Sequence, residues 1–213
     1  MEINITVVII AITVVISIIG FRNEQLMRKW IFNPYIIKRR NEVWRFLTAA
    51  FLHGNYLHLG LNMFVFWQFG SLLEYRFEET YKGDEGKVIL FFLLLYFPAA
   101  ILSCFYSYEK HKNDIHYNAL GASGAVSAIV FACIGLRPLE RLALFGVVPM
   151  PAFVFGILFL VVSWVLARKG KDNIGHDAHF FGALYGIMYV FIIQPWQLKI
   201  FFTDIQVYFQ NLF

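Results

Sequence analysis

The stretch GASGAVSAIVFACIG, residues 121–135, decides how this chain folds. Small residues recur along it at spacings of four, three, four and three: Gly121, Ala125, Ala128, Ala132 and Gly135. These spacings put them on one face of a helix, and in lipid such a face lets two helix backbones approach closely. A matching set, Ala178, Gly182 and Gly186, is spaced by four near the end of the chain. We therefore expect the two helices to pack directly together.

Composition predicts that these helices lie in a membrane. Of the 213 residues, 59% are hydrophobic and 15% are charged, against about 45–50% and about 25% in soluble domains. The apolar residues form runs that approach the roughly 20 residues needed to cross a bilayer. There are six such runs: 3–20, 56–74, 87–106, 121–136, 150–167 and 178–194. We expect an all-α membrane protein, a compact six-helix domain over residues 1–195 with a short, mildly amphipathic tail at 196–213.

The segment 21–55 differs from these runs. It is too polar to span a membrane, because it holds seven basic residues, and too rich in aromatic residues to be a free linker. An embedded loop of short helices, with its rings among the lipid headgroups, fits this composition. The net charge of +4 is scattered through loops, which favours contact with anionic lipid over nucleic-acid binding. Both cysteines lie in apolar runs, so we expect free thiols.

Polar residues at membrane depth are costly and usually functional. Ser123 opens the fourth run, His179 lies at the start of the sixth, and His58 and Asn62 share one face at the start of the second. Because these runs enter the membrane from the same side, we expect the four side chains to converge. A serine beside a histidine forms a nucleophile and its base, and His58, Asn62 and the Ser123 amide are able to stabilise an oxyanion. Asp177 does not share a helix face with His179, so a dyad is expected.

Ordinary interpretations compete with this one. A single serine in an apolar helix usually bonds to the preceding turn, and Ser127 is a second hydroxyl that we interpret as structural. Glu74 ends its run and is more readily a structural tie than a catalytic group, and His53 is expected to face water. Neither an HExxH motif nor a Cys/His quartet is present, so we predict no metal site and no other cofactor. A transporter remains an alternative, although paired broken helices typical of that class are not visible.

Five motifs, in chain order, resemble those of the rhomboid family of intramembrane serine proteases. They are Trp44-Arg45 (WR), His58 to Asn62 (HxxxN), Gly70 to Glu74 (GxxxE), Gly121 to Gly124 (GxSG) and Ala178 to Gly186 (AHxxGxxxG). GxSG alone is weak evidence, since hydrolases of other folds carry it. The whole set is highly specific and covers residues 1–195 together with the six-span architecture.

The resemblance implies that Ser123 attacks a scissile carbonyl while His179 acts first as base and then as acid. It implies an oxyanion hole of His58, Asn62 and the Ser123 amide. It also implies structural roles for a second group of residues: Trp44, Arg45, Glu74, Gly121, Gly124, Gly182 and Gly186. Substrates would be transmembrane segments of membrane proteins that enter laterally from the bilayer, with the fifth run as gate, and neither ATP nor metal would be required. The alternative within the family is a non-catalytic protein that binds membrane substrates; such relatives usually lack the serine or the histidine, and both are present here.

Two points depart from simple expectation. Basic residues number twelve on the side of the 21–55 loop and six on the other, so the positive-inside rule would place that loop in the cytoplasm. The resemblance implies the reverse orientation, with cytoplasmic termini, in what we expect to be a bacterial cytoplasmic membrane. Many rhomboids also have an aromatic residue four positions after the nucleophile, stacked on the histidine. Ser127 stands there in this chain, so we expect that His179 is held by another ring or less firmly.

Overall fold

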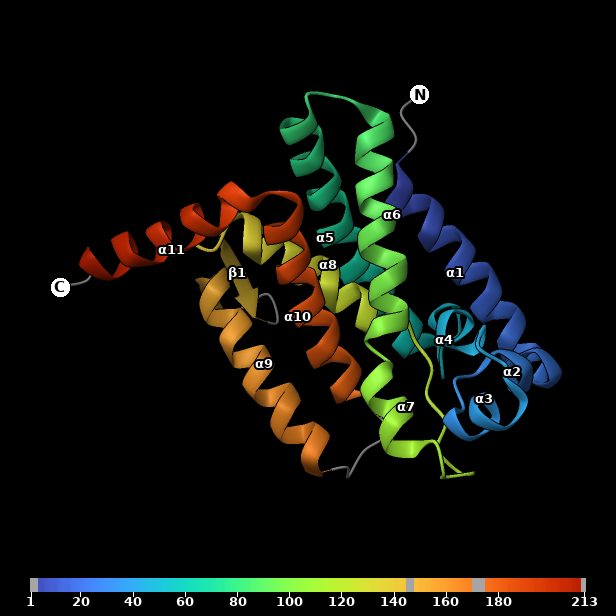
Figure 1. The fold of residues 1–213 in the computed structure, drawn as a ribbon. Coiled ribbons are helices and arrows are strands. Elements are labelled where there is room, and N and C mark those ends of the chain that lie inside the picture. The colour runs from blue at the N-terminus through green and yellow to red at the C-terminus, as the bar shows by residue number, and fades with distance from the viewer. Residues whose placement is uncertain (1–3, 145–147, 170–174, 212–213) are drawn as a thin grey trace.

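The computed structural model describes residues 4–144, 148–169 and 175–211. Each of the six predicted runs forms a helix, displaced by a few residues from its expected bounds. These helices are α1 (Ile5–Arg22), α5 (Tyr56–Tyr81), α6 (Glu85–Leu102), α8 (Ser123–Leu136), α9 (Ala152–Lys169) and α10 (His176–Ile193). Together they form the helical membrane bundle that the sequence predicts (Figure 1). Residue 3 and residues 212–213, within the predicted first span and tail, lie outside the described residues.

The six helices differ in how well they match the thickness of a bilayer. In the described part of the chain, four segments are long and apolar enough to cross a membrane: α1, α9, α10, and α6 continued through α7 (Phe105–His111). Helix α8 has 14 residues and is therefore about 21 Å long, shorter than the hydrocarbon core of about 30 Å. Helix α5 has 26 residues but carries several charged groups towards its end.

Helix α8 lies at the centre of the bundle, where α5, α6, α9 and α10 contact it (Figure 1). Every residue from Gly124 to Leu136 is buried, so this short helix meets protein rather than lipid on all sides. Its closest neighbour is α10. A β-carbon added at Gly186 would lie 2.6 Å from the Cα atom of Ala128 and would overlap its carbonyl oxygen. The small-residue spacing thus predicted the contact between these two helices correctly.

Helix α1 is joined to α5 through the GxxxE segment. The carboxylate of Glu74 accepts hydrogen bonds from the backbone N–H groups of Ile5 (3.1 Å) and Thr6 (2.6 Å) and from the Thr6 hydroxyl. The first N–H groups of a helix have no partner within it, and a carboxylate favours that positive end. Gly70 leaves the space that Thr6 occupies, because a β-carbon there would lie 2.6 Å from the Thr6 Cγ2 atom.

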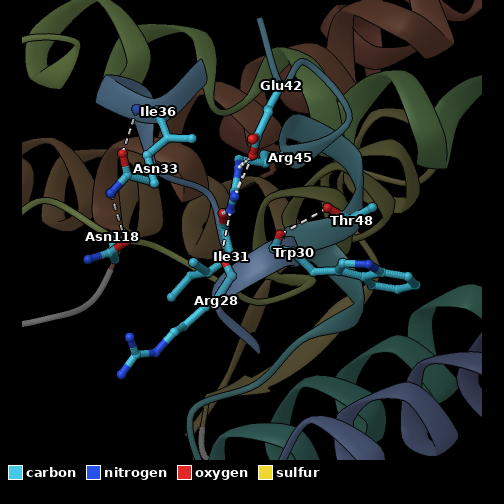
Figure 2. A network of polar contacts seen from close by, with 9 residues as sticks. All are labelled: Arg28, Trp30, Ile31, Asn33, Ile36, Glu42, Arg45, Thr48 and Asn118. Atoms are coloured by element: carbon cyan, nitrogen blue, oxygen red, sulfur yellow. Dashed lines mark hydrogen bonds and ion pairs between the residues drawn. The ribbon is translucent and has the colours of Figure 1, made fainter. Parts of the chain in front are cut away.

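The segment between α1 and α5 folds into short helices, as its composition predicts: α2 (Glu24–Trp30), α3 (Pro34–Arg40), α4 (Arg45–Thr48) and the 3₁₀ turn η1 (Ala49–Phe51). Figure 2 shows how Arg45 fastens them. Its buried guanidinium donates to the carbonyl oxygens of Arg28 (2.8 Å) and Ile31 (2.9 Å) and pairs with Glu42 (2.5 Å). Trp44 beside it is exposed. A single buried cation at the start of α4 thereby holds the end of α2 and the segment that follows α3.

Two elements lie outside the six-helix prediction. Residues 137–149 connect the fourth and fifth predicted runs, and no strand was predicted there. Strands β1 (Arg141–Leu144) and β2 (Val148–Pro151) pair antiparallel, with Arg141 opposite Pro151. The strands are four residues each, too short for their alternation to stand out between apolar helices. The tail forms α11 (Pro195–Gln210), which extends away from the bundle in Figure 1.

Candidate active site

Ser123 is the first residue of α8, and the backbone before it is tightly fixed. Gly121 has a φ of +123°, a conformation that is open to glycine but strained for residues with a β-carbon. Its N–H donates to the carbonyl oxygen of Ala49 (3.0 Å), and Ala119 exchanges two backbone hydrogen bonds with Phe32 (3.0 Å each). Asn33 also donates to Asn118 (3.1 Å; Figure 2). The embedded segment therefore sets the position of the turn that carries Ser123.

His58 lies against this turn. A β-carbon added at Gly121 would lie 2.9 Å from the Cε1 atom of His58, 3.1 Å from its Nε2 atom and 4.0 Å from the Ser123 hydroxyl oxygen. The missing side chain at Gly121 therefore makes room for the imidazole beside Ser123. Asn62, one turn further along α5, donates one amide hydrogen to the carbonyl oxygen of His58 (3.0 Å), and the same nitrogen carries a second hydrogen.

His179 lies in the first turn of α10, next to the first turn of α8. A β-carbon at Gly124 would lie 3.5 Å from the carbonyl oxygen of Ala178, and one at Gly182 would overlap the carbonyl oxygen of Gly124. The His179 ring lies 6.2 Å from the ring of Phe159 in α9, at an interplanar angle of 31°. The structure thus brings Ser123, His58 and the turn that carries His179 to one end of the bundle.

The sequence of the chain matches a known protein family. A family model described as the Rhomboid domain matches residues 40–196. The chain belongs to the rhomboid family. It is 32% identical over 151 residues to the human presenilin-associated rhomboid-like protein, mitochondrial; that match covers 68% of this chain and 36% of the relative. It is 25% identical over 186 residues to rhomboid protease GlpG of Salmonella paratyphi A, covering 86% of this chain and 59% of the relative.

A third relative is Rhomboid protein 1, mitochondrial, of Saccharomyces cerevisiae, which is 29% identical over 185 residues and is half covered by the match. The chain therefore spans between about a third and three fifths of the length of these curated relatives. The relative from Salmonella paratyphi A is named as a protease.

His53 lies beside the candidate site, in a position that differs from the one expected from the sequence. It was expected to face water, yet its side chain is fully buried and its ring lies 5.0 Å from the ring of His58 at 68°. The Ser17 hydroxyl donates to the carbonyl oxygen of Phe51 (2.8 Å), so its contact with His53 Nδ1 (2.9 Å) has the imidazole as donor. Burial, followed by the neighbouring His58, lowers the pKa of His53 from its ordinary 6.5 to about 3. His53 is therefore a neutral ring that packs against His58.

A second buried polar group, the carboxylate of Asp177, holds the first turn of α10, the helix that carries His179. The carboxylate of Asp177 accepts hydrogen bonds from the Ser107 hydroxyl of α7 (2.5 Å) and from the Ala178 N–H (2.9 Å). Burial and the charge of Asp177 raise the pKa of nearby Tyr117 to about 12, and the Tyr117 ring stacks on His111 at 3.7 Å. These contacts were not predicted from the sequence, because Ser107 and Asp177 are separated by 70 residues.

Metal-binding side chains and cysteine thiols are the other groups that could support chemistry in this chain. Within residues 4–144, 148–169 and 175–211, no three His, Cys, Asp or Glu side chains are grouped to hold a metal ion. Cys104 and Cys133 are free thiols, as expected, the first half-buried and the second buried.

Proposed function

We propose that this rhomboid is an intramembrane serine endopeptidase in which Ser123 is the nucleophile and His179 the general base. The observation that carries the proposal is the backbone contact between Gly124 and Gly182. That contact holds the first turns of α8 and α10 side by side, next to the serine and the histidine. A serine with an adjacent histidine is the arrangement that activates a hydroxyl for attack on a carbonyl.

In the first half of the reaction, the Ser123 hydroxyl oxygen forms a bond to the scissile carbonyl carbon while its proton passes to His179. The carbonyl oxygen becomes an oxyanion, which accepts hydrogen bonds from His58, Asn62 and the Ser123 N–H. The N–H groups in the first turn of α8 are available for this purpose, since a helix leaves its first amides unpaired. His58 beside Gly121 supports this assignment.

In the second half, His179 gives its proton to the leaving amine as the carbon–nitrogen bond breaks. An acyl-enzyme on Ser123 remains. Water then attacks the acyl carbon and passes a proton to His179, which returns it to the serine oxygen as the new carboxyl group leaves. One water molecule balances the hydrolysis, so the residues of the chain suffice for the chemistry.

The substrates we propose are transmembrane segments of membrane proteins that reach Ser123 laterally from the bilayer beside α9. Helix α9 is the least buried of the four long apolar segments: 22% of its residues are buried in the bundle, against 39% in α10. We place the enzyme in a bacterial cytoplasmic membrane with its termini in the cytoplasm. Labelling of single cysteines introduced at Asn113 and Lys82 by an impermeant maleimide on intact cells tests this orientation; labelling at Lys82 alone would reverse it.

The test of the proposed chemistry uses the purified chain in vesicles with a single-span reporter protein. Ser123→Ala and His179→Ala are each expected to reduce cleavage to about a thousandth or less, because the nucleophile and base act as a unit. Ser127→Ala, a hydroxyl one turn away, serves as the matched control and is expected to keep its activity. Cleavage that survives Ser123→Ala, or a fluorophosphonate probe that labels Ser127, would overturn the assignment.

A further inference from the structure

We propose that Phe159 of α9 is the positioning residue for His179, so that alignment of the serine and histidine depends on where α9 is seated. This inference rests on the proposed function and deepens it. The first observation is the ring contact itself. Aromatic pairs attract when their centroids are about 4.5–7 Å apart, and Phe159 and His179 lie 6.2 Å apart.

The second observation is that Phe159 is itself held in place. Its ring lies 5.5 Å from Phe131 of α8 and 6.0 Å from Phe155 one turn earlier in α9. Phe131 is buried and lies two turns after Ser123 on the same helix. A path of packed rings therefore runs from the serine helix through Phe159 to the histidine. A side chain fixed in this way is able to restrain the imidazole that it touches.

The third observation is the residue at position 127. Ser127 is buried one turn after Ser123 and one turn before Phe131, so α8 offers the histidine a hydroxymethyl group rather than a ring at that level. The ring comes instead from a neighbouring helix. His176 also lies 5.8 Å from His179, at 86°, but it belongs to the same helix and moves with it. Phe159 thus joins His179 to a different helix through a ring contact.

The contact between Phe159 and His179 depends on the position of α9. The helix stands at the edge of the bundle beside α10 (Figure 1), and several of its apolar side chains are exposed: Ile157, Leu158, Val161, Val162 and Val165. Its first half is fastened through Phe153, whose ring packs on Tyr208 and Phe209 of α11. Phe159 lies beyond this attachment. A displacement of α9 relative to α10 would therefore separate Phe159 from the imidazole, and the return of α9 would restore the contact.

The test compares two aromatic contacts between the same pair of helices. Phe159→Leu removes the ring that contacts His179 and keeps an apolar side chain. Trp164→Leu is the matched control, because Trp164 lies 5.1 Å from Phe180 of α10 and does not contact the histidine in this way. We expect Phe159→Leu to lower kcat about threefold to tenfold, the range that the loss of an aromatic contact allows, with KM nearly unchanged. The rate of fluorophosphonate labelling of Ser123 should fall by the same factor.

Two further variants separate positioning from general packing. Phe159→Tyr keeps the ring and should retain wild-type kcat. Ser127→Phe, added to Phe159→Leu, supplies a ring from α8 and should restore part of the lost kcat without restoring the packing of α9. Equal losses of kcat in Phe159→Leu and Trp164→Leu, or a loss that follows only the unfolding temperature, would overturn the proposal.

A measurement that does not depend on activity keeps the two proposals distinguishable. In protein labelled with ¹³C-histidine, the His179 ring signals, assigned from His179→Gln, should shift in Phe159→Leu and stay unchanged in Trp164→Leu. Unshifted signals in Phe159→Leu would refute the role of Phe159. A wild-type chain that neither cleaves the reporter nor labels with the probe would refute the proposed function alone.

Discussion

Gly182 of α10 and Gly124 of α8 are in backbone contact: a β-carbon built at Gly182 would lie 2.8 Å from the carbonyl carbon of Gly124 and closer still to its oxygen. Neither partner is a flexible side chain, so the clash is relieved only when the two helices separate. Overpacking a buried site costs about 1–3 kcal/mol, sometimes more. We expect Gly182→Ala to lower the free energy of unfolding by about 3 kcal/mol and to abolish most of the cleavage, as measured by thermal unfolding in detergent and by the reporter assay.

The matched control for Gly182→Ala is Gly60→Ala. Gly60 also lies inside a membrane helix, α5, but a β-carbon there meets no atom within 4 Å. Alanine is a better helix former than glycine by about 1 kcal/mol, so Gly60→Ala should leave stability unchanged or slightly raise it. If both variants lost the same stability, the loss would reflect helix propensity in lipid, and the close approach of α8 and α10 would be excluded as its cause.

These helix contacts were largely predictable from the sequence. Apolar runs fix where the six helices lie, and the recurrence of Gly182 and Gly186 at a spacing of four identifies the face that meets α8. The proximity of Ser123 and His58 was expected for a similar reason, because each lies at the start of a run that enters from the same side. Local spacing carries this information, since a helix repeats its faces every three to four residues.

Contacts between separate segments were not predictable in this way. The partner of His53 is Ser17, 36 residues earlier, and the ring beside His179 is Phe159, on another helix. Neither pair shares a periodic pattern, so a serine in an apolar run and a phenylalanine in the next look like ordinary packing residues. The pairing of β1 with β2 was missed for a different reason, because it involves only four residues on each strand.

The hydrogen bond between Ser107 and Asp177 offers a test of how α10 is held at its first turn. Ser107→Ala leaves a buried carboxylate oxygen without its donor, and such a loss costs about 1–3 kcal/mol. We expect it to destabilise the fold by that amount and to lower kcat, since the turn that carries His179 is then fixed less firmly. Thermal unfolding and reporter cleavage measure the two effects.

A double-mutant cycle shows whether the effect belongs to this pair. Asp177→Ala should be destabilising by itself, and adding Ser107→Ala to it should cost little more, because residues in one hydrogen bond are coupled. Asp114→Asn is the control, since Asp114 is exposed just after α7, where charges contribute about 0–1 kcal/mol. Fully additive losses for Ser107 and Asp177 would contradict the contact.

The burial of the His53 ring makes the free energy of unfolding decrease as the pH falls. The pKa of His53 is about 3 in the folded chain, against an ordinary value of 6.5, so folding favours the neutral imidazole. Its contribution is complete above pH 6.5 and is lost progressively as the pH falls towards 3, because the unfolded chain binds the extra proton first. Between pH 7.5 and 4.5 the loss should be about 3 kcal/mol, read from unfolding in detergent at both values. His53→Gln removes the titrating group, so its stability should change less across this interval than that of the wild type. An equally steep loss in His53→Gln would assign the pH dependence to other groups and would contradict a buried, neutral His53 behind His58.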